Sequence, residues 1–188
     1  FLKAGSFAPK IDLGPDRLRD NPVCFGESLL LDTKLPATYT YKWFKDNVEI
    51  FGATQPSYTV TDTGAYSVEV IFTPATCSAT GNINIEYAPE ILLTDTTLTQ
   101  CDDNGDGVTL FDLTKADNII KNNDTTLSPV VYYETLADAK GKINPIQNPA
   151  TYTNKPSVPI LFARVTNTFG CANYAQLNLV IANNSIAP

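Results

Sequence analysis

The stretch TYTYKWFK at residues 38–45 decides the fold, because its side chains alternate between two environments. Tyr39, Tyr41 and Trp43 fall on one face, with Thr and Lys between them. A period of two places successive side chains on opposite faces of a strand, so the pattern predicts a half-buried β-strand. Because Trp43 alternates with Tyr41, we expect its ring to lie in the core rather than on a sugar-stacking surface.

Other stretches of the first half alternate in the same way and are separated by turn residues such as Asp46-Asn47. Half a dozen short strands at this spacing, with almost no helical periodicity, predict an all-β fold of the sandwich type. The remaining predicted strands are Ser28–Asp32, Ser57–Val60, Ala65–Phe72 and Asn82–Tyr87, and an added edge strand at Ile11 and Leu13 is a further expectation.

Two features point to an immunoglobulin-like sandwich. Trp43 lies 19 residues after Cys24, where such a domain places its core tryptophan. The stretch DTGAY at residues 62–66 is similar to a tyrosine corner, in which the tyrosine hydroxyl bonds to an upstream backbone group. In antibody domains the second cysteine would fall at residue 68, which is Val68 here.

Ala88-Pro89-Glu90 is the expected domain boundary, because it is short and contains proline. We therefore predict two tandem domains, residues 1–88 and residues 89–188. The second half adds helical patterns to its strands and is predicted to be a sandwich with short helical insertions. Its predicted elements are helices at Leu113–Lys121 and Leu136–Gly141, a strand at Val130–Tyr133, a loop at 144–159, and a hairpin of Ile160–Asn167 with Tyr174–Ile181 around Cys171.

Charge and composition exclude several classes of function. The formal net charge is −7 without a basic cluster, so nucleic acid is a poor partner. No apolar run approaches the roughly 18 residues that span a bilayer, so membrane insertion is not expected. The sequence contains no histidine, which removes Ser–His and Cys–His catalytic pairs. The clustered carboxylates Asp102, Asp103 and Asp106 lie in a polar turn and should stay ionised, so the chain is predicted not to be an enzyme.

The four cysteines, Cys24, Cys77, Cys101 and Cys171, contain no C-x-x-C pair, so a zinc site is not expected. Three disulfide connectivities are formally possible. We predict Cys24–Cys77 and Cys101–Cys171, because this choice keeps each bridge inside one domain. Two disulfides imply an oxidising, extracytoplasmic compartment.

The stretch CDDNGDG at residues 101–107 has the spacing of metal ligands. Oxygen donors alternate along it, and Gly107 stands where an EF-hand loop makes its sharp turn. The twelfth position of such a loop is Leu113 rather than Glu, so a fixed structural Ca²⁺ site is predicted in place of a helix–loop–helix sensor. The alternative is a metal-free Asx turn, since Asp, Asn and Gly are also turn formers. The predicted ligands are Asp102, Asn104, Asp106, the carbonyl of Val108, and Asp112.

Two sets of residues resemble known modules. Cys24-x-Gly26-x-Ser28, YKWFKD at 41–46 and GAYSV at 64–68 resemble the immunoglobulin-like or PKD-like modules of large Bacteroidetes surface proteins. CDDNGDG at 101–107, FDLT at 111–114 and RVTN at 164–167 with Cys171 resemble the repeat that often follows them. The resemblance covers about residues 24–181.

The resemblance implies a flavobacterial protein exported by the type IX secretion system to the outer cell surface of a Gram-negative bacterium, of the gliding or adhesin type. Implied partners are neighbouring repeats of the same polypeptide, the secretion machinery and surface glycans. The chain contains neither Met nor a sorting domain, so we expect a piece of a longer array. Asp95-Thr96-Thr97 and Asp124-Thr125-Thr126 resemble the O-glycosylation motif of such proteins and predict glycans on Thr96 and Thr125, the alternative being ordinary polar loops.

The hypothesis favoured by these observations is a non-catalytic structural and adhesive module that spaces or presents domains of a surface protein. The alternative is a carbohydrate-binding accessory module of a secreted multidomain enzyme. For the alternative, the stacking candidates are Tyr132, Tyr133 and Tyr152, and strand alternation leaves at most one of the first two available.

Overall fold

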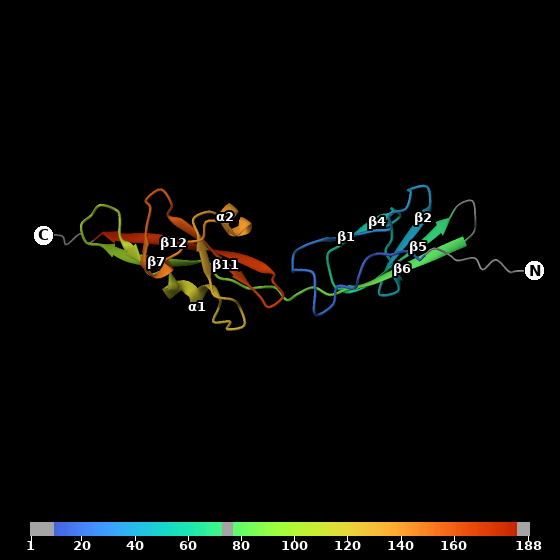
Figure 1. Ribbon diagram of the computed structural model, residues 1–188, viewed down its shortest axis with the longest axis horizontal. Coiled ribbons are helices and arrows are strands. Elements are labelled where there is room, and N and C mark those ends of the chain that lie inside the picture. The colour runs from blue at the N-terminus through green and yellow to red at the C-terminus, as the bar shows by residue number, and fades with distance from the viewer. Residues whose placement is uncertain (1–9, 73–76, 184–188) are drawn as a thin grey trace, which may run out of the picture. The chain divides into compact units, whose positions relative to one another are not determined.

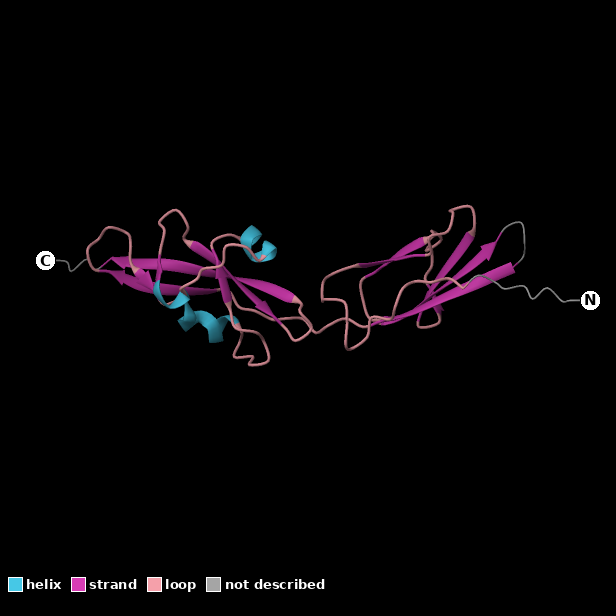
Figure 2. Ribbon diagram, viewed as in Figure 1, coloured by secondary structure: helices cyan, strands magenta, loops and turns pink. Residues whose placement is uncertain are grey.

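The computed structural model describes residues 10–72 and 77–183. The chain forms two compact units, which meet between Glu90 and Ile91 in the sequence, two residues after the predicted boundary. Both units are built from β-sheets, so the predicted all-β, immunoglobulin-like class is confirmed (Figures 1 and 2). No helix within the described ranges has the length and apolar character needed to cross a membrane.

The first domain is a sandwich of two antiparallel sheets, one of strands β1 and β4 and one in the order β3-β2-β5-β6 (Figure 1). Residues of both sheets share one buried core, which explains why the predicted strands alternate. The strands are β1 (Leu29–Asp32), β2 (Thr40–Lys45), β3 (Val48–Glu49), β4 (Ser57–Val60), β5 (Gly64–Phe72) and β6 (Cys77–Ile85).

Trp43 lies at the centre of this core, as predicted, and is fully buried. Its indole Nε1 donates a 2.9 Å hydrogen bond to the carbonyl oxygen of Gln55, so the one polar atom of the ring is satisfied. Trp43 faces Val68 across the β2–β5 register. Val68 is also fully buried and fills the position of the second antibody cysteine with an aliphatic side chain.

Asp46 and Asn47 connect β2 to β3 with positive φ angles of 50° and 67°. Two successive residues in the left-handed region form the type I′ turn that fits the twist of a two-residue hairpin. Asp and Asn tolerate this region better than other residues with a Cβ atom. The turn predicted from these two residues is therefore confirmed.

The tyrosine corner is also confirmed. The hydroxyl oxygen of Tyr66 lies 3.1 Å from the Asp62 carbonyl oxygen and 2.5 Å from Asp62 Oδ1. Burial of the ring and the bond to Asp62 raise the pKa of Tyr66, so the hydroxyl keeps its proton and remains a donor. The bond fixes the loop before β5 to the strand that follows it.

Residues 10–24 do not form the edge strand predicted from Ile11 and Leu13. They run along β6, held first by Ile11 and then by single bridges from Arg17 to Ile85 and from Val23 to Tyr87. Gly81 makes this close approach possible, since a Cβ atom there would lie 2.8 Å from the Ile11 carbonyl oxygen. The lead-in is irregular because its prolines and turns interrupt a continuous ladder.

The second domain has a four-stranded sheet in the order β7-β12-β11-β9 and a two-stranded sheet of β8 and β10 (Figure 1). Its elements are β7 (Thr96–Asp102), β8 (Leu110–Phe111), η1 (Leu113–Ala116), α1 (Asp117–Ile120), β9 (Val131–Tyr133), α2 (Leu136–Gly141), η2 (Pro149–Thr151), β10 (Tyr152–Thr153), β11 (Ile160–Thr166) and β12 (Ala172–Asn183).

Several predicted elements of the second domain are confirmed. The hairpin of β11 and β12 encloses Cys171, and α2 has the predicted bounds. The predicted helix at 113–121 is two short pieces, η1 and α1. Strand β10 was not predicted, because residues 144–159 were expected to be a loop.

Strand β7 was not predicted either, and its pairing with β12 is the only parallel pairing between strands in the described part of the second domain. It is polar and mostly exposed at the sheet edge, so its sequence lacks the alternation that marks a half-buried strand. Its parallel partner β12 lies some 80 residues later in the chain.

The core of the second domain lies between the inner face of the four-stranded sheet and a layer formed by β8, β10 and the two short helices. Figure 2 shows η1 and α1 beside the sheet. Buried members of this core are Phe111, Leu113, Ala116, Ile120, Tyr132, Tyr152, Leu161, Ala163, Val165, Ala175, Leu177 and Leu179.

We expect Tyr66→Phe to destabilise the first domain by about 1–2 kcal/mol, because it deletes a buried hydroxyl that satisfies the Asp62 carbonyl oxygen. Chemical denaturation followed by Trp43 fluorescence measures the change. Tyr58→Phe is the matched control, since the Tyr58 hydroxyl makes no hydrogen bond within the described part of the chain and both rings remain. Equal stability of the two variants would contradict a structural role for the corner.

Candidate functional site

The four cysteines are in two different states. Cys24 and Cys171 are disulfide-bonded, whereas Cys77 and Cys101 are free and exposed. The predicted pairs Cys24–Cys77 and Cys101–Cys171 are therefore wrong.

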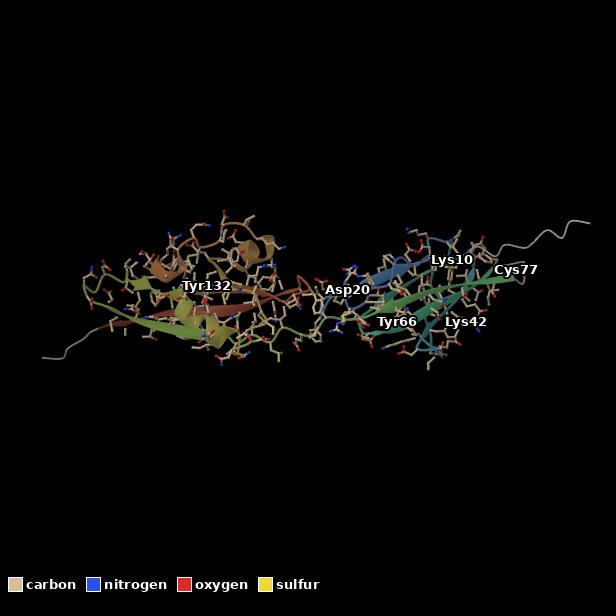
Figure 3. All side chains as sticks on the ribbon, turned by 60° about the horizontal axis from the view of Figure 1, so that its bottom comes forward. Lys10, Asp20, Lys42, Tyr66, Cys77 and Tyr132 are labelled. Atoms are coloured by element: carbon tan, nitrogen blue, oxygen red, sulfur yellow. The ribbon has the colours of Figure 1, made fainter. Side chains whose placement is uncertain are left out.

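In the first domain, the length of β6 separates Cys24 from Cys77. Val23 pairs with Tyr87 at one end of this strand, and Cys77 begins the strand ten residues earlier. Ten strand residues span about 33 Å, while a disulfide requires Cα atoms roughly 4.4–6.8 Å apart. Figure 3 shows Asp20, from the segment before Cys24, and Cys77 at opposite ends of this domain.

In the second domain, β12 imposes the same separation. Cys101 on β7 pairs in register with Ala182, near the end of β12, and Cys171 immediately precedes Ala172 at its start. These positions are again ten strand residues apart, or about 33 Å. The two cysteines of each predicted pair therefore lie beside opposite ends of one long strand, too far apart to bond.

Cys24 lies at the end of the first domain from which the chain leaves. The amide of the preceding residue, Val23, donates to the Glu86 carbonyl oxygen at 2.9 Å, and the Val23 carbonyl oxygen accepts from the Ala88 amide at 2.8 Å. These bonds attach the segment around Cys24 to the last residues before the domain boundary.

Cys171 lies at the end of the second domain where the chain enters. Asn167 holds the turn before it: Oδ1 of Asn167 accepts from the Phe169 amide at 3.0 Å and from the Cys171 amide at 3.1 Å. Two residues later, Asn173 Nδ2 donates to the carbonyl oxygen of Ile91 at 2.7 Å. The bonded cysteine of each domain is therefore the one beside the boundary residues.

The acidic loop is organised around the Asp102 carboxylate. Asp102 Oδ1 accepts from the amides of Asn104 at 3.2 Å and Gly105 at 2.9 Å, and Oδ2 accepts from the Gly107 amide at 2.7 Å. These backbone bonds, that of Gly107 above all, lower the pKa of Asp102. The expectation that this carboxylate stays ionised is confirmed. Gly105 and Gly107 adopt φ angles of 74° and 80°, which glycine allows without strain.

The other predicted calcium ligands also make hydrogen bonds within the chain. Asn104 Nδ2 donates to Asp106 Oδ2 at 2.8 Å, Asp106 Oδ1 accepts from the Val108 amide at 2.8 Å, and Asp112 Oδ1 accepts from Thr114. Across residues 10–72 and 77–183, no group of three or more Asp, Glu or Cys side chains is arranged to hold a metal ion. The geometry matches the metal-free Asx turn, and Ca²⁺ binding stays a prediction.

Asn154 is a site residue that sequence reasoning missed. Its side chain is buried, accepts from the Thr109 amide at 2.7 Å and donates to the Gly107 carbonyl oxygen at 3.0 Å. It thereby fastens the end of the acidic loop to the residues that follow β10. No sequence pattern marked it, because it lies in a segment predicted to be loop.

The two predicted glycosylation sites differ in exposure. Thr125 is exposed in the turn after α1, where Asp124 Oδ1 accepts from the amide and hydroxyl of Thr126. Thr96 is half-buried at the start of β7, opposite Leu177 of β12. Modification at either residue stays a prediction.

The three predicted stacking tyrosines are all buried, which corrects the expectation that Tyr132 or Tyr133 would be available. The Tyr132 hydroxyl lies 2.9 Å from the Leu113 carbonyl oxygen and 2.6 Å from Asp117 Oδ1. Burial raises the pKa of Tyr152 to about 12, and its hydroxyl lies 3.3 Å from Glu134 Oε1. These rings serve the core, so they offer no platform for a sugar.

Residues 97–186 match a protein family described as the Flavobacterium inter-domain disulphide bond domain. The match indicates an immunoglobulin-like domain of flavobacterial type in the second half of the chain. None of the curated proteins compared with the chain matches it.

Solved structures to which the chain is similar include tandem immunoglobulin domains. Immunoglobulin domains 1–4 of Sidekick-1 are 13% identical, with 93% of this chain and 47% of that chain covered and a TM-score of 0.32. The I67–I69 fragment of the titin I-band is 14% identical, with 92% and 65% covered and a TM-score of 0.31. The insect immune protein hemolin is 10% identical, with 93% and 46% covered and a TM-score of 0.36. The chain spans less than two thirds of the length of each.

We expect Asp102→Asn to lower the melting temperature of the second domain, because an amide NH₂ replaces one of the two acceptor oxygens that hold the loop amides. The lowered pKa of Asp102 means that its stabilisation is complete above its ordinary value of 3.8 and is lost as the pH falls through the pKa of the folded state. Thermal unfolding between pH 7 and pH 2 measures both effects.

Asp103→Asn is the matched control, since Asp103 is exposed and makes no side-chain hydrogen bond in the described loop. It should leave the melting temperature unchanged. An Asp102→Asn variant that melts at the wild-type temperature would show that the carboxylate does not organise the loop.

Proposed function

We propose that the chain is a non-catalytic structural module of a large secreted surface protein, in which one disulfide between Cys24 and Cys171 joins the two domains. The observation that carries the proposal is the state of the cysteines. The sequence has four, two are free thiols, and the two that are disulfide-bonded belong to different domains. Within one chain, each bonded cysteine has no other bonded sulfur to pair with.

The place of each cysteine in its own domain supports this pairing. Val23, next to Cys24, is hydrogen-bonded to Glu86 and to Ala88. Asn173, two residues after Cys171, is hydrogen-bonded to Ile91. Both therefore lie beside the short segment that connects the domains. The description of the family matched by residues 97–186, an inter-domain disulphide bond domain, agrees with the same assignment.

A second covalent connection changes how a tandem behaves. A single linker of three residues, 88–90, leaves several backbone torsions free to rotate. A disulfide between Cys24 and Cys171 would add a second covalent connection beside this linker and would remove much of this freedom. The chain would then act as a stiff spacer, which suits a protein that holds a binding domain away from a cell.

The setting of the module follows from the same chemistry. Disulfides persist in oxidising compartments, which supports a location outside the cytoplasm. The family match and the resemblance of the sequence support an outer-surface protein of a flavobacterium, exported by the type IX secretion system and used in adhesion or gliding. Neighbouring repeats are the proposed partners, and structural Ca²⁺ at the acidic loop and glycans on Thr125 and Thr96 remain parts of this proposal.

The free-thiol count tests the bridge directly. Unfolded, unreduced protein should react with two equivalents of a maleimide, at Cys77 and Cys101, and a non-reducing peptide map should contain one peptide pair linking Cys24 to Cys171. A map that links Cys24 to Cys77 would overturn the proposal, as would four free thiols in protein purified from the native compartment.

Motion of the domains tests the stiff joint. With the disulfide intact, nuclear-spin relaxation of the two domains should report one common tumbling time, because a bridged joint transmits rotation. After mild reduction each domain should tumble faster and separately while its amide spectrum stays folded. Cys77→Ser is the control, since it removes a free thiol and should leave the common tumbling time unchanged. Separate tumbling in the oxidised protein would contradict the spacer.

A further inference from the structure

We propose a further function, which rests on the Cys24–Cys171 bridge of the proposed function: the tandem carries tensile load while both of its cores stay unstretched. A pull on the two ends of the chain follows the shortest covalent path. That path runs to Cys24, crosses the two sulfurs and continues from Cys171. The 146 residues from 25 to 170 form a side loop that the pull does not enter.

The side loop contains most of both folded domains, so the path of the pull bypasses them. The loop contains all the strands of the first domain, β1 to β6, and every described element of the second domain except β12. Trp43 and Tyr66 in one core and Tyr132 in the other belong to this loop and therefore lie outside the path. In a tandem joined only by residues 88–90, the same pull would pass through both cores in series.

Strand β12 is the part of the second domain that bears the load. Its 12 residues pair with β11 over residues 172–178 and with β7 over residues 177–183. A strand rises about 3.3 Å per residue, close to the limit of an extended chain, so tension adds little to its length. Because β7 and β11 belong to the side loop, no opposing pull shears the hydrogen bonds that hold β12 to them.

The segment before Cys24 is the part of the first domain that can yield. Residues 11–23 lie along residues 81–87, the end of β6 and the two residues that follow it, from Ile11 at Gly81 to Val23 at Tyr87. Thirteen residues thus cover a length that residues 81–87 cover with seven. Straightening the surplus of six would lengthen the molecule by about 20 Å, and the bridges to Ile85 and Tyr87 would break first.

Single-molecule stretching tests the proposal on the full chain carrying Cys77→Ser and Cys101→Ser, which remove the exposed thiols and keep the bridge. With handles at both ends, the oxidised molecule should lengthen by about 20 Å and no further until the handles fail. Adding a phosphine reductant should release about 500 Å of extended chain in two steps, one for each domain, because the side loop contains 146 residues at about 3.4 Å each. A variant that also carries Cys24→Ser should show these steps without reductant.

A peptide map of the same monomeric sample separates the two proposals. If the peptide linking Cys24 to Cys171 is missing, the bridge and the proposed joint are both wrong. If that peptide is present and the oxidised monomer still lengthens beyond about 80 Å, the full extended length of the 23 residues before Cys24, the shielding of the cores is overturned while the joint stands.

Discussion

A disulfide spans only about 6 Å between Cα atoms, and this short reach governs how the chain uses its cysteines. Strands β6 and β12 are nine and 12 residues long. In each domain one cysteine lies beside the start of this strand and the other lies beside its end, so neither domain can close a bridge on itself. Cys24 and Cys171, next to the domain boundary, are the disulfide-bonded cysteines, and Cys77 and Cys101 at the far ends are free thiols. The length of these strands therefore decides which cysteines within a domain can pair.

The sequence predicted the features that depend on local alternation and turn chemistry. Trp43 entered the core, Asp46-Asn47 formed the hairpin turn, and Tyr66 made its corner bond, because each depends on residues close in the chain. The predicted disulfide pairing is wrong because the number and spacing of cysteines do not tell which of them lie at the same end of a domain. Parallel pairing of β7 with β12 was missed for the same reason, since it joins distant segments.

The acidic loop and the tyrosines show a different limit of sequence reasoning, which is that one pattern fits two environments. Oxygen donors at alternate positions can bind a cation. In this loop, however, both carboxylate oxygens of Asp102 accept hydrogen bonds from backbone amides, which stabilise the negative charge as a cation would. Alternation predicted that one of Tyr132 and Tyr133 would face solvent. Helix α2 packs on β9 and β11, so the second face of the sheet is covered as well and both rings are buried.

The core of the first domain shows why that domain needs no disulfide between its sheets. Antibody domains place a disulfide between their sheets, and here Val68 stands against Trp43 in that region with both side chains fully buried. Burial of a large aromatic ring against an aliphatic neighbour stabilises the sandwich without a covalent link. Each domain is therefore expected to fold in either redox state, and the proposed Cys24–Cys171 bridge would act on the connection between the domains. Reduction of that bridge would change the mechanics of the tandem while its cores persist.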